Sequence, residues 1–230
     1  MRLVIFGANG QTGRLLARQA LDAGHTAVAV TRRPEDFPFA DPALTVAGAD
    51  VHDAAALIDI VAGADAVLST LGVTFTREPV DTYSVGTANI VAAMRQTGVR
   101  RLVVVSSAAV DHYPGRTGTP FALRVVEPII TRTIGKTVYD DMRRMETIVR
   151  DSGLDWTIVR PSGLFDLPCV TDYVAGEVDP VGTFTSRADL ADYLVRLADD
   201  AGHPGTVVIS TTVNTPTMWQ MIRREAFKSA

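Results

Sequence analysis

The sequence predicts an α/β domain with a doubly wound parallel sheet. Short apolar runs alternate along the chain with longer segments of helical periodicity. Most of the apolar runs are continuously hydrophobic, as in Leu102-Val103-Val104-Val105, and a strand of that kind is buried on both faces. Helices on both sides of a parallel sheet provide such burial.

The elements follow from these runs in order along the chain. We expect strands at residues 2–6, 26–31, 43–47, 65–70, 100–105, 155–159 and 206–210. We expect helices at residues 11–23, 53–62, 81–98, 139–152 and 187–199, and a docked terminal helix within 216–227. A chain of 230 residues has the size of one domain, so residues 1–230 are expected to form a single unit.

The composition is that of a soluble globular protein, with 47% hydrophobic and 21% charged residues. The net charge of −4 argues against nucleic-acid binding. No apolar run approaches the roughly 20 residues of a membrane span. Because the first strand runs directly into a glycine turn, we expect no signal peptide. The single cysteine, Cys169, fits a reducing compartment and is expected to be buried. We therefore expect a cytoplasmic protein with no membrane or nucleic-acid partner.

Two segments, residues 108–138 and 163–186, are longer than ordinary loops. Both follow strands at their carboxyl ends, where open α/β sheets bind ligands, so we expect them to form the walls of a substrate pocket. Residues 121–134 are apolar with scattered arginines, which fits either a short helix pair beside the pocket or a dimer contact. The sequence leaves the oligomeric state open between monomer and homodimer.

A glycine-rich turn, Gly7-Ala8-Asn9-Gly10-Gln11-Thr12-Gly13, follows the first strand and opens the first helix. Glycines allow a tight turn and a close approach of the backbone to a pyrophosphate, and the helix N-terminus offers free N–H groups to the phosphates. A glycine motif alone is weak evidence, but its place between a strand and a helix is the one that dinucleotide binding needs. We expect the dinucleotide site to include Gly7, Asn9, Gly10, Gln11, Thr12 and Gly13.

The second strand ends in Arg32-Arg33, at the position where an NAD-preferring site has a carboxylate for the ribose hydroxyls. A guanidinium can instead bind a 2′-phosphate through two hydrogen bonds and stack on adenine. Glu35 and Asp36 follow Pro34, past the usual position of that carboxylate. The cofactor expected from this pattern is NADP(H).

Three later features fit the same ligand, because each lies at or just after the carboxyl end of an expected strand. They are Asp50 and Val51 after the third strand, Thr70, Leu71 and Gly72 at the fourth, and Ser106 and Ser107 at the fifth. We expect the first pair near the adenine, the glycine close to the cofactor, and the two serines near the nicotinamide.

These residues resemble the atypical short-chain dehydrogenase/reductases of the NmrA-like, NAD(P)H-binding type, and within them the flavin reductase (biliverdin reductase B) branch. The resemblance covers nearly the whole chain and rests on residues 5–13, 89–94, 140–145, 150–154 and 186–190. It implies a Rossmann fold and the reduction of flavins, quinones or linear tetrapyrroles, or else cofactor binding as a sensor. It places Ser107 beside the nicotinamide, and Pro161, Ser162, Gly163 and Leu164 on the other side. Residues 115–138 are longer and more apolar than in that branch, so the substrate does not carry over.

Candidate chemistry centres on Tyr139 and Arg143. Related reductases use a tyrosine and a lysine four residues apart, the lysine lowering the tyrosine pKa. An arginine is a fixed cation that relays no proton, although it can hold a ribose, or it can simply pair with Asp140 or Glu146. Ser107 can orient the nicotinamide or pass a proton through water. The four histidines lack metal-ligand spacing, so no metal site is expected.

Three functions remain open on these residues. The leading hypothesis is an NADPH-dependent reductase that transfers hydride to a flavin, a quinone or a related conjugated acceptor, which stabilises negative charge itself. The second is a carbonyl reductase or dehydratase that uses Tyr139 on a hydrophobic substrate. The third is a non-catalytic NADP(H) redox sensor.

Overall fold

The computed structural model describes residues 1–118, 133, 135–200 and 205–217. Its strands are β1 (Arg2–Phe6), β2 (Thr26–Thr31), β3 (Leu44–Gly48), β4 (Ala66–Ser69), β5 (Arg101–Val105), β6 (Asp155–Pro161), β7 (Gly163–Phe165), β8 (Tyr173–Gly176), β9 (Phe184–Ser186) and β10 (Gly205–Thr211). Its α-helices are α1 (Gln11–Asp22), α2 (Ala54–Val61), α3 (Thr82–Thr97), α5 (Lys136–Arg150) and α6 (Arg187–Asp199). Two short 3₁₀ helices, η1 (Pro34–Asp36) and η2 (Ala108–Val110), follow β2 and β5.

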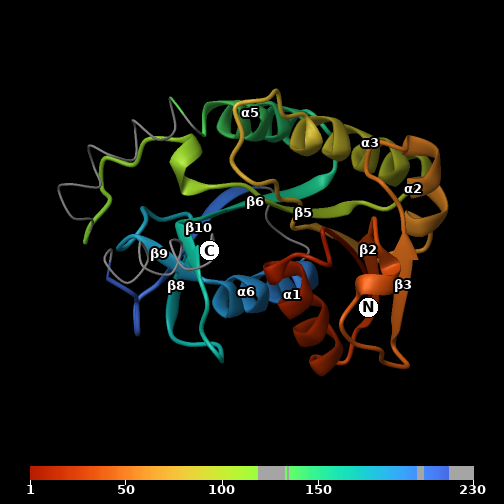
Figure 1. The fold of residues 1–230 in the computed structure, drawn as a ribbon, viewed down its shortest axis with the longest axis horizontal. Coiled ribbons are helices and arrows are strands. Elements are labelled where there is room, and N and C mark those ends of the chain that lie inside the picture. The colour runs from red at the N-terminus through yellow and green to blue at the C-terminus, as the bar shows by residue number, and fades with distance from the viewer. Residues whose placement is uncertain (119–132, 134, 201–204, 218–230) are drawn as a thin grey trace.

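The described residues form a main sheet of eight strands in the order β3-β2-β1-β4-β5-β6-β10-β8. Figure 1 shows β3 and β2 toward one side of the molecule and β10 and β8 toward the other. Neighbouring strands are parallel except β10 and β8, which are antiparallel. From β1 the sheet grows outward through β2 and β3, and from β4 it grows the other way through β5 and β6. This reversal is the doubly wound pattern, so the predicted fold class is confirmed.

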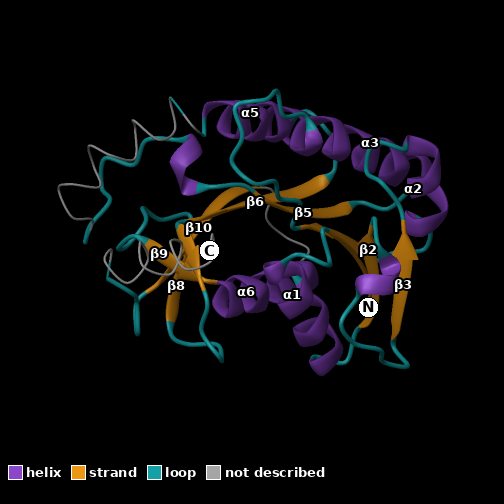
Figure 2. Ribbon diagram, in the orientation of Figure 1, coloured by secondary structure: helices purple, strands orange, loops and turns teal. Residues whose placement is uncertain are grey.

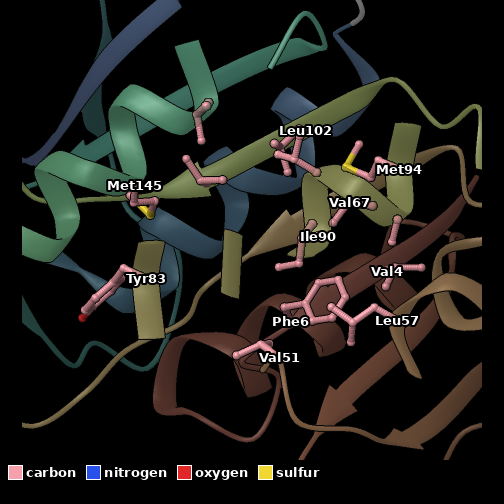
Figure 3. Packing of buried hydrophobic residues seen from close by; sticks show 14 of the residues in the cluster. Val4, Phe6, Val51, Leu57, Val67, Tyr83, Ile90, Met94, Leu102 and Met145 are labelled. Carbon is pink, nitrogen blue, oxygen red and sulfur yellow. The ribbon is translucent and has the colours of Figure 1, made fainter. Parts of the chain in front are cut away.

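Helices cover both faces of the sheet (Figure 2). α2, α3 and α5 pack on one face, and α1 and α6 pack against each other on the opposite face. In β1, Val4 and Phe6 join the core under the first group of helices (Figure 3), whereas Leu3 and Ile5 join the core under the second. All four side chains are fully buried, which explains why the strand is apolar at every position rather than at alternate ones.

Residues 163–186 differ from the sequence prediction, which gave them no regular element. They contain β7, β8 and β9, and β7 pairs with β9 in a separate small sheet. Strands of three or four residues are too short to show a period in the sequence, so pattern analysis misses them. The expectation that Cys169 is buried was also wrong, since it is exposed in this segment. The proposed helix pair or dimer contact at 121–134, apart from Thr133, and the terminal helix beyond residue 217 lie outside the described residues.

Candidate functional site

A cleft of about 830 Å³ lies at the carboxyl ends of the central strands. The strand order reverses between β1 and β4, and open α/β sheets bind ligands at this crevice. Most of the predicted site residues line this cleft: Gly7, Asn9, Gly10, Gln11, Thr12, Arg32, Arg33, Asp50, Val51, Thr70, Leu71, Gly72, Ser106 and Leu164. The fold thus brings together residues from five successive strand ends and from β7.

The other predicted residues lie outside the lining of the cleft as the described residues define it. They are Gly13, Ser107, Tyr139, Arg143, Pro161, Ser162 and Gly163. Of the two long segments, Leu164 from 163–186 contributes to the lining, and none of the described residues of 108–118 does.

The three glycines of the turn serve different purposes. Gly7 has φ +73°, and a Cβ there would lie 2.6 Å from the carbonyl oxygen of Thr70. A Cβ at Gly13 would lie 2.3 Å from the carbonyl oxygen of Gly7, so Gly13 lets α1 pack closely on the turn. At Gly10 a Cβ would approach, among the described atoms, only the carbonyl oxygen of Gly7, at 3.2 Å. Gly10 therefore keeps space open in the cleft, whereas Gly7 and Gly13 permit the turn itself.

The N-terminus of α1 opens on this cleft without a side-chain cap or an acidic residue in its first turn, within the described residues. The first intrahelical hydrogen bond runs from the Arg14 N–H to the Gly10 carbonyl at 2.9 Å, so the earlier N–H groups are available to an anion. Arg14 also donates from Nε and Nη2 to Oδ1 of Asn9, at 2.9 and 2.7 Å. Sequence reasoning missed Arg14, although it directly follows the last glycine of the motif.

At the β2–β3 end of the cleft, Arg32 and Arg33 are exposed, and Nε of Arg33 lies 3.3 Å from Oδ2 of Asp36. Nearby, His52 bridges two carboxylates, with Nδ1 2.9 Å from Asp50 and Nε2 3.0 Å from Asp81. These two hydrogen bonds raise the pKa of His52. Its backbone and side-chain hydrogen bonds in turn lower the pKa of Asp50. Sequence reasoning missed His52, which follows the expected Asp50-Val51 pair.

At the β5 end the lining is more apolar and includes Val105, Met142, Leu164, Phe75 and Tyr83. Ser106 is buried there, and its hydroxyl donates to Oε1 of Glu146 at 2.7 Å.

Ser107 is not among the described lining residues; it caps η2, because its hydroxyl accepts a hydrogen bond from the N–H of Ala109 at 3.2 Å. The two adjacent serines therefore have different roles.

Tyr139 and Arg143 are held outside the cleft lining by local contacts. The ring of Tyr139 lies 5.9 Å from the ring of Phe75, measured between centroids. Arg143 donates to the carbonyl of Val110 at 3.2 Å and to Asp140 at 2.9 Å. This pairing with Asp140 is one of the two structural alternatives that the sequence offered for Arg143.

These features fit a dinucleotide. The open space at Gly10 would receive the pyrophosphate, and the uncapped start of α1 would bind its charge. Arg32 would lie on the adenosine side, while the apolar β5 end is suited to a flat, weakly polar ring.

Comparison with known proteins agrees with this geometry. The sequence model of NAD(P)H-binding proteins matches residues 7–201. The chain belongs to this NAD(P)H-binding family. Arg187, which lines the cleft, lies within the matched range and in the 186–190 stretch of the predicted resemblance, so that signal was already in the sequence.

Individual relatives are distant. An uncharacterised protein of Mycobacterium tuberculosis is 30% identical over 227 residues, which cover 93% of this chain, and the chain spans only 21% of that protein. The (4-alkanoyl-5-oxo-2,5-dihydrofuran-3-yl)methyl phosphate reductase of Streptomyces griseus is 34% identical over 69% of the chain and 46% of its own length. A short-chain dehydrogenase/reductase from Veillonella parvula, solved in complex with NADP, shares the fold with a TM-score of 0.75 at 20% identity, covering 94% of this chain and 99% of its own.

Two features are absent from the described residues. None of their helices is long and apolar enough to cross a membrane. They also contain no group of three or more His, Cys, Asp or Glu residues arranged to hold a metal ion.

Proposed function

We propose that the protein is an NADPH-dependent reductase that passes hydride to a flavin, a quinone or a related conjugated acceptor. The observation that carries this proposal is one cleft with a cationic end at Arg32 and an apolar end at Val105 and Met142. Arg32 directly follows β2, where an NAD site needs a carboxylate, and a guanidinium matches a 2′-phosphate. Bound NADPH would supply the hydride, and the protein's residues would position it and exclude water.

At the β5 end of the cleft, none of the described lining residues is a suitable proton donor, which supports an acceptor that stabilises negative charge itself. Among the residues that the structure describes, Tyr139 and Arg143 lie outside the lining, and Arg143 cannot relay a proton. Tyr83 does line the cleft, but burial raises its pKa, and its hydroxyl accepts a hydrogen bond from the N–H of Val73 at 3.2 Å. A tyrosine with a raised pKa is a poor proton donor, so oxidised flavins and quinones suit the site better than simple ketones.

The family and its relatives are consistent with reduction as the reaction class. The Streptomyces griseus relative is a reductase by name, and its named substrate contains an oxo-dihydrofuran ring. The resemblance to the flavin reductase branch supports a flavin as the first acceptor to test.

The test follows NADPH oxidation by its near-ultraviolet absorbance with riboflavin, a naphthoquinone and a hydrophobic ketone in turn. Turnover with the flavin or the quinone is the expected result, and the Gly10→Val variant serves as the control with a blocked cleft. Turnover with the ketone alone would replace the proposal with a carbonyl reductase. Tight NADPH binding without turnover of any acceptor would favour a sensor instead.

A further inference from the structure

A buried charged cluster lies directly behind the β5 end of the cleft. Glu146 on α5 is only 2% exposed, and Arg160 on β6 is 6% exposed. Arg160 donates to both carboxylate oxygens of Glu146, from Nε at 2.9 Å and from Nη2 at 2.6 Å. Arg150 adds a third hydrogen bond at 2.7 Å, and the Ser106 hydroxyl a fourth. Burying such a pair costs desolvation energy, so stability alone is a weak explanation for it.

Glu146 is a carboxylate in this cluster. Burial by itself raises the pKa of Glu146, but the hydrogen bonds from Arg160 and Ser106 outweigh it and hold the pKa below its ordinary value. An ionised carboxylate only accepts hydrogen bonds. The single proton of the Ser106 hydroxyl is therefore directed to Oε1 of Glu146, 2.7 Å away.

The Ser106 hydroxyl can consequently only accept a hydrogen bond from a group in the cleft, because its own proton is already donated to Glu146. The Ser106 backbone N–H is already bonded to the carbonyl of Val159 at 2.8 Å. Ser106 lines the cleft, and the oxygen of its fixed hydroxyl keeps lone pairs that can accept a hydrogen bond from a ligand.

The position of Ser106 identifies the partner. Arg32 marks the adenosine end of the cleft, the glycine turn after β1 marks its middle, and Ser106 follows β5 on the far side of β4. A dinucleotide laid along these strand ends would therefore bring its nicotinamide to Ser106. Among the rings expected there, the nicotinamide carries a carboxamide with two N–H donors, a quinone ring offers only carbonyl acceptors, and a flavin ring has a single ring N–H; the order of the strand ends places the nicotinamide, rather than the acceptor, nearest to Ser106.

We propose that Ser106 accepts a hydrogen bond from the carboxamide N–H of the nicotinamide, and that Glu146 is the positioning residue that fixes the hydroxyl for this contact. The inference rests on the proposed function, because it requires NADP(H) in the cleft. It assigns the contact with the nicotinamide to Ser106, whereas the family resemblance indicates the neighbouring Ser107. Ser107 instead uses its hydroxyl to cap η2.

The test compares the dissociation constants of NADPH and of its 3-acetylpyridine analogue, in which a methyl ketone replaces the carboxamide and removes both N–H donors. The wild type is expected to bind NADPH about three- to tenfold more tightly than the analogue, the value of one neutral hydrogen bond. Ser106→Ala should weaken NADPH binding by the same factor and change analogue binding less than about twofold. Ser107→Ala is the matched control, since it is the same substitution at the adjacent residue.

The inference would be overturned if Ser106→Ala kept the preference for NADPH over the analogue, or if Ser107→Ala lost it instead. The proposed reductase function would stand in either case. Failure of the wild type to bind either nucleotide would overturn the proposed function itself. Glu146→Gln supplies a second readout, because a glutamine amide can donate to Ser106 and release its proton toward the cleft. This change should reduce the preference for NADPH over the analogue, and an equal loss for both nucleotides would mean that Glu146 has only a structural role. Should this variant not fold, Ser106→Ala decides the question.

Discussion

Replacing Arg32 with alanine should weaken the binding of NADPH and leave the binding of NADH nearly unchanged. Arg32 directly follows β2 and lines the cleft; it makes no ion pair within the described residues, although its charge lowers the pKa of Asp50. Its guanidinium is therefore available to a 2′-phosphate, the only group that distinguishes the two nucleotides. Arg33 is a less suitable ligand, because its side chain is 72% exposed and already lies 3.3 Å from Asp36.

The structure sets the size of this effect. A hydrogen bond to a charged group contributes about 1.5–3 kcal/mol when it is well formed, and solvent exposure reduces such contributions. Taking about 1–2 kcal/mol for the exposed Arg32, we expect roughly five- to thirtyfold weaker NADPH binding in Arg32→Ala. For Arg33→Ala we expect at most about threefold, since the phosphate must compete with Asp36.

Titration of NADPH and NADH into the wild type and both single variants, at low and at high salt, measures these differences. Screening should weaken NADPH binding more than NADH binding as the salt concentration rises. Equal affinity of the wild type for the two nucleotides would refute the reasoning. An equal loss of affinity for both nucleotides in Arg32→Ala would also refute it, because that result would mean a disturbed cleft rather than a lost phosphate contact.

Three further predictions, on four substitutions, test other parts of the site. Gly10→Val should abolish nucleotide binding and leave the protein folded, because among the described atoms its Cβ would approach only one carbonyl oxygen, at 3.2 Å. Gly13→Ala, whose Cβ would lie 2.3 Å from a backbone oxygen, should destabilise the protein more, by an overpacking cost of about 1–3 kcal/mol, and should therefore have the lower melting temperature. A folded Gly10→Val protein that binds nucleotide normally contradicts this assignment. Tyr139→Phe should reduce flavin or quinone turnover by less than about tenfold, and a loss above about a hundredfold with intact NADPH binding would restore Tyr139 as the general acid. The pKa of Glu146 is lowered in the folded protein from an ordinary value of 4.5, so its contribution to stability is present above that pH and is lost as the pH falls through the lower folded-state pKa. Melting curves from neutral to acidic pH should accordingly show a shallower acid-induced loss of stability in Glu146→Gln than in the wild type, and identical slopes would contradict this linkage.

The sequence by itself determined the fold class, most strand and helix positions and the dinucleotide turn. Continuously apolar strands such as β1 require burial on both faces, and only helices on both sides of a parallel sheet provide it. The turn could be predicted because its glycines, at positions 7, 10 and 13, lie within one short segment between a strand and a helix. Arg32 could be predicted as well, since it directly follows a predicted strand.

The tertiary structure alone decided which side chains meet around the cleft. Ser106 and Ser107 are indistinguishable in the sequence, but adjacent residues at a strand end point in different directions, so only one of them faces the cleft. Glu146 and Arg160 belong to α5 and β6, and their pairing depends on how that helix packs on the sheet. The short strands β7 to β9 leave no period in the sequence because three or four residues are too few to form one. Such contacts depend on how distant segments of the chain pack together, so the spacing of residues along the sequence does not predict them.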